Sequence, residues 1–168
     1  MPVSGADHYE ICSRSNSGSF ALRGVSATNH FPDSSLTPAT TYLYEVRAVD
    51  ASGTRSPFSN IDFATTIIFT DDPLTVGSTA VKAIHLNELR QAVNAMRVTA
   101  GLSAITFTDT IDPSVTIVQA SHINQLRSGL TQARSAFGLG SSYTDDPLVA
   151  GSTTIKAIHV QEIRDAVK

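Results

Sequence analysis

A unit of about 37 residues recurs through the second part of this 168-residue chain, and it constrains the fold more than any other feature. The segment Phe69-Thr-Asp-Asp-Pro-Leu74 returns as Tyr143-Thr-Asp-Asp-Pro-Leu148, and a divergent copy starts at Phe107. Self-similarity at a fixed period is typical of arrays in which each repeat buries its apolar face against its neighbours. We therefore expect three loop-helix units, at residues 68–103, 104–141 and 142–168, stacked as an all-α array or short α-solenoid.

Within the first unit, Val81, Leu89 and Met96 recur at helical spacing. Gly101 and Gly138 follow the expected helices, and glycine commonly stands just beyond the end of a helix. The third unit stops at Lys168, short of the length that its first counterpart reaches, so we expect this helix to be interrupted.

A histidine and an arginine recur in every unit. We interpret them as residues that hold each helix to a neighbouring loop or repeat, because positions shared by all copies of an array usually make the stack. The alternative is a ligand-binding, metal-binding or catalytic role, although each copy offers one histidine rather than a cluster. These candidates are His85, His122, His159, Arg90, Arg127 and Arg164.

The Asp-Asp-Pro loops supply a second candidate site. Asp71, Asp72, Asp145 and Asp146 are potential ligands of Ca²⁺, which takes six or more oxygens, but aspartate before proline is also an ordinary turn former. Zinc or calcium held by a repeat histidine and these loops would make a small metal-dependent hydrolase, which is one alternative function. Known nucleophile, phosphate-loop and zinc-protease motifs are absent from the sequence, so we predict no catalytic residue and, calcium apart, no cofactor.

Residues 1–67 favour β structure. Polarity alternates from Thr41 to Asp50, and shorter runs occupy residues 8–13, 19–23 and 59–66. The segment Leu36-Thr-Pro38-Ala-Thr-Thr-Tyr42, followed by that alternation and a Ser-Gly turn, resembles the second half of a fibronectin type III domain. The resemblance implies a partial all-β sandwich with strands C to G. It also implies that Leu36 and Pro38 are structural and that Tyr42 is the corner tyrosine, with its hydroxyl bonded to nearby backbone.

The same resemblance implies two earlier strands, A and B, for which too few residues precede the first expected strand. Without them the sheet would expose a large apolar face, which is uncommon in soluble monomers. We favour a truncated domain. The alternatives are cover by the helical part and strands supplied by another chain, which would make the protein a self-associating subunit completed by strand donation.

The pattern Lys-Ala-Ile-His-Leu-Asn-Glu-Leu-Arg at residues 82–90 resembles helical repeats of bacterial multi-domain surface proteins, and that resemblance implies an extracellular or cell-surface location. The net charge of −3 without a basic cluster predicts no nucleic-acid partner, and no apolar run is long enough for a membrane partner. We expect a non-catalytic structural, spacer or adhesive module of a larger secreted protein. Its expected partners are other modules of the same parent chain, polysaccharide or a cell-surface protein.

Overall fold

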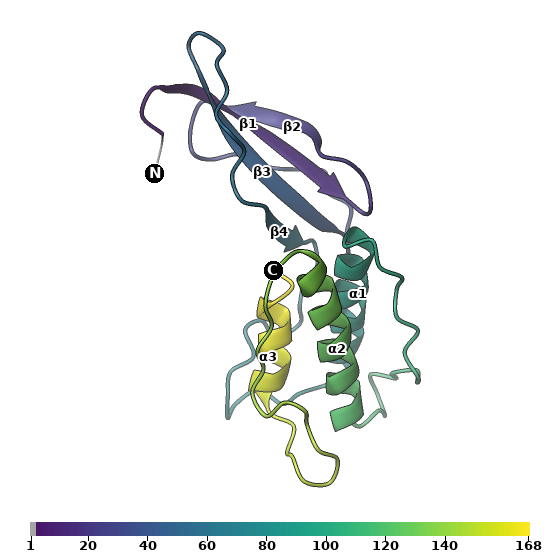
Figure 1. Cartoon of the computed structure of the whole chain (residues 1–168). Helices are drawn as coiled ribbons and strands as arrows, with labels where there is room; N and C mark the ends of the chain where they lie inside the picture. The colour runs from purple at the N-terminus through teal and green to yellow at the C-terminus, as the bar shows by residue number, and fades with distance from the viewer. Residues whose placement is uncertain (1–2) are drawn as a thin grey trace.

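Four strands form one antiparallel sheet, in the order β2-β1-β3-β4, at one end of the molecule (Figure 1). The computed structural model describes residues 3–168. The long central strands are β1 (Ala6–Ser15) and β3 (Thr41–Asp50). The edges are β2 (Ala21–Ser26) and the short β4 (Asp62–Thr65).

The pairing of β1 with β3 separates the two faces of the sheet, because successive side chains of a strand point to opposite sides. Ile11 lies opposite Val46 on one face, which is largely apolar. Glu10 lies opposite Arg47 on the other face, where their side chains form an ion pair at 2.6 Å. The alternation in the sequence therefore yields one apolar face and one face that carries charge.

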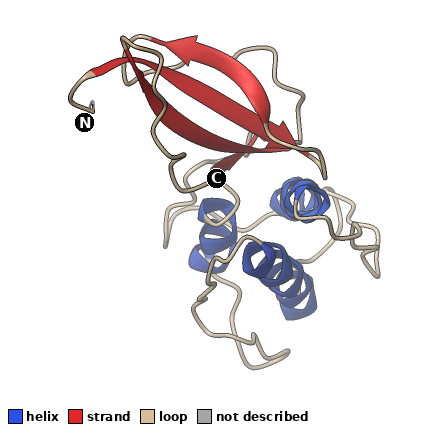
Figure 2. Ribbon diagram, turned by 45° about the horizontal axis from the view of Figure 1, so that its top comes forward, coloured by secondary structure: helices blue, strands red, loops and turns tan. Residues whose placement is uncertain are grey.

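Three helices pack together below the sheet and run in the same direction, with their C-terminal ends toward it (Figures 1 and 2). They are α1 (Ala83–Thr99), α2 (Ala120–Ala136) and α3 (Ala157–Asp165). Gly101 and Gly138 follow α1 and α2 with φ of +76° and +75°. Glycine takes this conformation without the steric cost of a Cβ, so both helices end where the sequence predicts.

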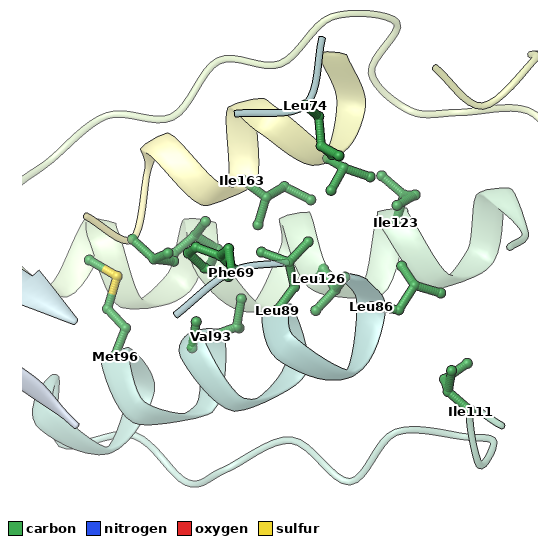
Figure 3. Close-up of a cluster of buried hydrophobic side chains, with 14 of the residues drawn as sticks. Phe69, Leu74, Leu86, Leu89, Val93, Met96, Ile111, Ile123, Leu126 and Ile163 are labelled. Atoms are coloured by element: carbon green, nitrogen blue, oxygen red, sulfur yellow. The ribbon is translucent and has the colours of Figure 1, made fainter. Parts of the chain in front are cut away.

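The helices bury their apolar stripes against one another (Figure 3). Leu89, Leu126 and Ile163, one from each helix, are at most 1% exposed. The connecting loops also supply core residues, because each loop returns along the outside of the bundle and inserts apolar side chains between the helices. These buried loop residues are Phe69, Leu74, Ile111 and Leu148.

A buried threonine joins the sheet to the bundle. The Thr99 hydroxyl, at the end of α1, donates to the backbone carbonyl of Thr41 at 3.0 Å and accepts from the backbone N–H of Asn16 at 3.2 Å. Beside this contact the ring of Phe63 stacks on that of Phe137, with ring centres 6.3 Å apart. The sheet and the helices are therefore bonded directly to each other.

The expected fold class, a partial all-β sandwich followed by an all-α array of three repeats, is wrong. The molecule is a mixed structure of one four-stranded sheet and three helices, and helix accounts for only 26% of the chain. Residues 27–40, between β2 and β3, form an irregular loop. Much of each repeat is extended loop. These loops, in place of further helices, supply apolar side chains to the core.

Candidate functional site

Each helix begins with the same contact between a buried histidine and the backbone three residues earlier. The backbone N–H of Lys82 donates to Nδ1 of His85 at 3.2 Å, and the equivalent bonds to His122 and His159 measure 3.1 and 3.2 Å. These residues are 0%, 5% and 0% exposed, respectively. The contact is half of a capping box, in which the side chain at the third helical position accepts from the capping residue, with histidine in place of Glu or Gln.

The second ring nitrogen faces an aspartate in the preceding loop. Because Nδ1 accepts a hydrogen bond, the neutral ring carries its proton on Nε2 and donates it to the carboxylate. Both nitrogens are therefore engaged, which leaves no free lone pair for a metal ion or for general-base catalysis. The pairs are His85 with Asp71 at 3.3 Å, His122 with Asp109 at 2.6 Å and His159 with Asp145 at 3.1 Å.

Each repeated arginine reaches the loop of the next unit. The Arg90 guanidinium donates to the backbone carbonyl of Asp109 at 2.7 Å and to its carboxylate at 2.6 Å. Arg127 donates to the carbonyl of Thr144 at 2.9 Å. Each guanidinium also lies over the aromatic ring that opens that loop, an arrangement favoured by the negative ring face. The pairs are Arg90 over Phe107 at 4.4 Å, Arg127 over Tyr143 at 4.9 Å and Arg164 over Phe69 at 4.8 Å.

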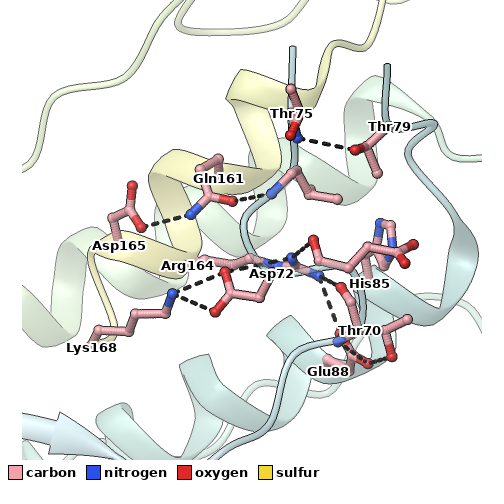
Figure 4. Close-up of polar contacts among 12 residues, drawn as sticks. Thr70, Asp72, Thr75, Thr79, His85, Glu88, Gln161, Arg164, Asp165 and Lys168 are labelled. Atoms are coloured by element: carbon pink, nitrogen blue, oxygen red, sulfur yellow. Dashed lines mark hydrogen bonds and ion pairs between the residues drawn. The ribbon is translucent and has the colours of Figure 1, made fainter. Parts of the chain in front are cut away.

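The last unit contacts the first in the same way (Figure 4). Arg164 donates to the backbone carbonyls of Thr70 at 2.7 Å and Asp71 at 3.0 Å, and its guanidinium lies 3.3 Å from the Glu88 carboxylate. The side chain of Arg164 is fully buried. The three units therefore form a closed ring by head-to-tail contacts, rather than an open solenoid.

A polar side chain on each helix repeats the same connectivity. The Asn87 amide donates to the backbone carbonyl of Ile111, and Asn124 both donates to and accepts from the backbone of Leu148. Gln161 accepts from the backbone N–H of Leu74 at 2.8 Å and so connects the third unit to the first (Figure 4). These residues recur at the repeat period, and that recurrence is the signal that would have identified them from the sequence.

The loop aspartates are held by cations of the chain itself. Lys82 lies 2.7 Å from the Asp71 carboxylate, Lys156 lies 3.0 Å from that of Asp145, and Lys168 lies 2.7 Å from that of Asp72. The hydrogen bonds from Lys82 and Lys156 lower the pKa of Asp71 and of Asp145. Asp146 lies 3.7 Å from Arg127. Within residues 3–168 no cluster of three or more His, Cys, Asp or Glu side chains is placed to hold a metal ion, and calcium binding stays a prediction.

A hollow of about 410 Å³ lies over the apolar face of the sheet, beneath the loop that follows β2. Tyr9, Ile11, Tyr44, Val46 and Phe31 supply most of its apolar wall. The Phe31 ring packs so closely on the backbone of Gly24 that a Cβ there would lie 2.4 Å from it. This hollow was not predictable from the sequence, because the covering loop carries no periodic pattern.

Asp33 closes one side of the hollow. It accepts hydrogen bonds from the Arg23 guanidinium at 2.6 Å and from the Tyr44 hydroxyl at 2.7 Å. The bond from Arg23 is the main cause that lowers the pKa of Asp33, whereas burial, followed by the bond to Asp33, raises that of Tyr44. The polar groups on this wall are therefore already paired within the chain.

The residues that the resemblance implied to be structural lie at the junction of sheet and helices. The Tyr42 hydroxyl accepts from the backbone N–H of Thr37 at 3.0 Å, five residues earlier. Leu36 and Pro38 line a shallow hollow of about 550 Å³ together with Glu88 of α1. The loop before β3 is thus held both to its own strand and next to the first helix.

No family model matches this chain, and neither a curated protein nor a solved structure is significantly similar to it. In the part of the chain that the structure describes, none of the helices has the length and apolar character needed to cross a membrane.

Proposed function

We propose that this chain is a non-catalytic structural module, a spacer within a larger extracellular or cell-surface protein. The observation that carries this proposal is that the repeated histidines, through both ring nitrogens, and the repeated arginines, through their terminal guanidinium nitrogens, hold loops to helices. His159, for example, is 0% exposed, with one ring nitrogen bonded to the backbone of Lys156 and the other to Asp145. A catalytic histidine needs a nitrogen free to exchange a proton with substrate.

The junction between sheet and bundle supports a spacer role, because a spacer must keep a fixed geometry between its ends. Arg14 donates to the backbone carbonyl of Thr99 at 3.0 Å, in addition to the bonds that Thr99 makes with Thr41 and Asn16. Arg134 lies over the Phe63 ring at 5.9 Å. Directional polar bonds and stacked rings together resist both rotation and separation of the two parts.

Segment-resolved hydrogen exchange of the whole chain in rising urea tests the spacer proposal. We expect β1 and β3 to unfold in the same transition as α1 and α2, and Thr99→Ala to weaken or split this coupling. Val98→Ala is the control, because Val98 precedes Thr99 and is 38% exposed. Independent unfolding of sheet and helices in the native chain would contradict a rigid spacer. A reproducible hydrolytic activity that disappears in His159→Gln would contradict the non-catalytic assignment.

A second candidate function is adhesion through the hollow over the sheet. Its volume of about 410 Å³ lies in the range of small-ligand sites, and aromatic rings form much of its wall. Titration with soluble oligosaccharides, followed by amide chemical shifts, tests this role. Binding should be lost in Tyr44→Ala and kept in Phe58→Ala, since Phe58 packs on Arg47. Shifts that do not involve β1 or β3 would exclude this hollow.

A further inference from the structure

Asp71 takes part in two contacts at once. Its side chain holds the start of α1, and its backbone belongs to the contact, or joint, between the third unit and the first. One carboxylate oxygen, Oδ2, accepts from Lys82 at 2.7 Å and from Nε2 of His85 at 3.3 Å. The backbone carbonyl of the same residue accepts from Arg164 at 3.0 Å. The contact that orders the start of α1 therefore also positions the carbonyl to which α3 is bonded.

A proton added to His85 would disturb this arrangement in two ways. Nδ1 would become a donor facing the backbone N–H of Lys82, which now donates to it at 3.2 Å. The new positive charge would also lie in the first turn of α1, where the helix dipole disfavours cations. The carboxylate oxygen that would compensate the charge is already shared with Lys82.

The second unit shares the contact at Nδ1 and the place in the first helical turn, but it lacks the competing lysine. Its capping residue is Gln119, and Arg90 bonds the other oxygen of Asp109, so the oxygen that faces His122 is not shared with a cation. Nε2 of His122 lies 2.6 Å from the Asp109 carboxylate, against 3.3 Å for the His85 pair. His122 is therefore a matched control for His85, with the same place in the repeat and a closer, unshared carboxylate oxygen.

We propose that the contact between His85 and Asp71 is an acid-sensitive latch, and that protonation of His85 opens the joint between the third and first units. The Asp71 loop would move away from α1, and the carbonyls of Thr70 and Asp71 would then no longer be held for Arg164. The helix α3 would separate from α1, while the joint between α1 and α2 would stay closed.

The charges around His85 agree with this direction. Burial has the largest effect on His85 and disfavours the charged ring, as does the buried Arg164. Asp71 and Glu88 favour the charged ring, but the pKa of His85 still falls below its ordinary value of 6.5. Lys82 competes for Asp71. A histidine with a lowered folded pKa stabilises the closed form above about pH 6.5, and this stability is lost as the pH falls toward the folded pKa.

Hydrogen exchange of the whole chain, corrected for intrinsic rates, tests the latch. Between pH 7.5 and 5.5 the opening constant of α3 should rise by up to about tenfold relative to that of α2. In a His159→Gln background, which removes the equivalent histidine at the start of α3, His85→Gln should abolish the rise, because glutamine keeps the capping bond and does not titrate. His122→Gln should leave the rise unchanged. A rise that persists in the double variant, or one that is lost in His122→Gln, would overturn the proposal.

A titration of the native protein gives a readout that does not depend on folding of the variants. The ring resonances of His85 should titrate with a midpoint below 6.5, and the backbone amide of Lys82 should shift with the same midpoint. A His85 midpoint above 6.5 would show that the fold favours the protonated ring, and it would refute the latch.

Discussion

Arg164 donates a hydrogen bond to the backbone carbonyl of Thr70 at 2.7 Å, across 94 positions of sequence, and this bond fastens the last helix to the first loop of the bundle. Every other arginine joint connects units that are neighbours in the chain. The closing joint therefore gives the bundle its long-range connectivity, and the helical half should be most sensitive to substitution there.

Arg164→Ala should lower the free energy of unfolding by about 2–4 kcal/mol, because it removes the donor to the carbonyls of Thr70 and Asp71 and the cation beside the buried Glu88 carboxylate. Lys168→Ala is the matched control, since Lys168 makes a more exposed ion pair with Asp72 and should contribute less than about 1 kcal/mol. Urea unfolding followed by far-ultraviolet circular dichroism measures both. Equal effects would show that the ring closure contributes little.

Gly129→Val should destabilise the protein by about 1–3 kcal/mol through overpacking. A Cβ at Gly129 would lie 2.1 Å from Cδ1 of Ile105 and 3.3 Å from Cγ1 of Val93, and valine adds two further methyl groups. Gly140→Val is the control, because its Cβ would meet open space. Thermal unfolding should give a lower midpoint for Gly129→Val than for Gly140→Val. An unchanged midpoint in Gly129→Val would mean that the loop at Ile105 moves aside without a cost in stability.

Tyr42→Phe should cost about 1 kcal/mol, because the backbone N–H of Thr37 loses its acceptor. The control is Tyr9→Phe, whose hydroxyl accepts from the backbone of Val3 near the chain terminus, where fraying limits the cost. Denaturant midpoints at one pH are sufficient for the comparison. A larger effect at Tyr9 would contradict a structural role for the Tyr42 hydroxyl.

The hydrogen bonds that Glu10 accepts predict that the stability of the sheet falls in acid. Hydrogen bonds from Arg55 and Arg47 lower the pKa of this carboxyl from 4.5 to about 2. A carboxyl with a lowered folded pKa stabilises the fold above about pH 4.5, and that contribution is lost as the pH falls toward 2. Unfolding measured from pH 5 to pH 2.5 should therefore show a smaller loss of stability in Glu10→Gln than in the native protein. Arg55→Gln should return the pKa of Glu10 toward 4.5.

The sequence predicted the helices α1 and α2, although not the all-α array, because the signal for a single helix is local. The periodic apolar residues and the glycines Gly101 and Gly138 lie close to α1 and α2, and helix ends depend on nearby residues. Likewise, the alternation from Thr41 to Asp50 predicted β3 with the bounds that the structure has. These elements needed no knowledge of distant contacts.

The tertiary arrangement depends on contacts that no local pattern encodes. Arginine at position 164 was expected to contact a neighbouring repeat, but its spacing does not show that the partner is the first unit rather than the second. The sandwich was inferred from a resemblance, whereas the loop with Phe31 folds over the sheet instead of adding a strand. Long-range closure and loop packing were therefore not predictable from the sequence pattern.

The closed ring also limits how such a repeat can be multiplied. Each aromatic loop already receives one arginine, at Phe69, Phe107 and Tyr143, so a fourth copy could join only if one of these contacts opened. An open array grows one unit at a time into a superhelix. Duplication of this unit would instead require one contact of the ring to open, or a second ring to form beside the first.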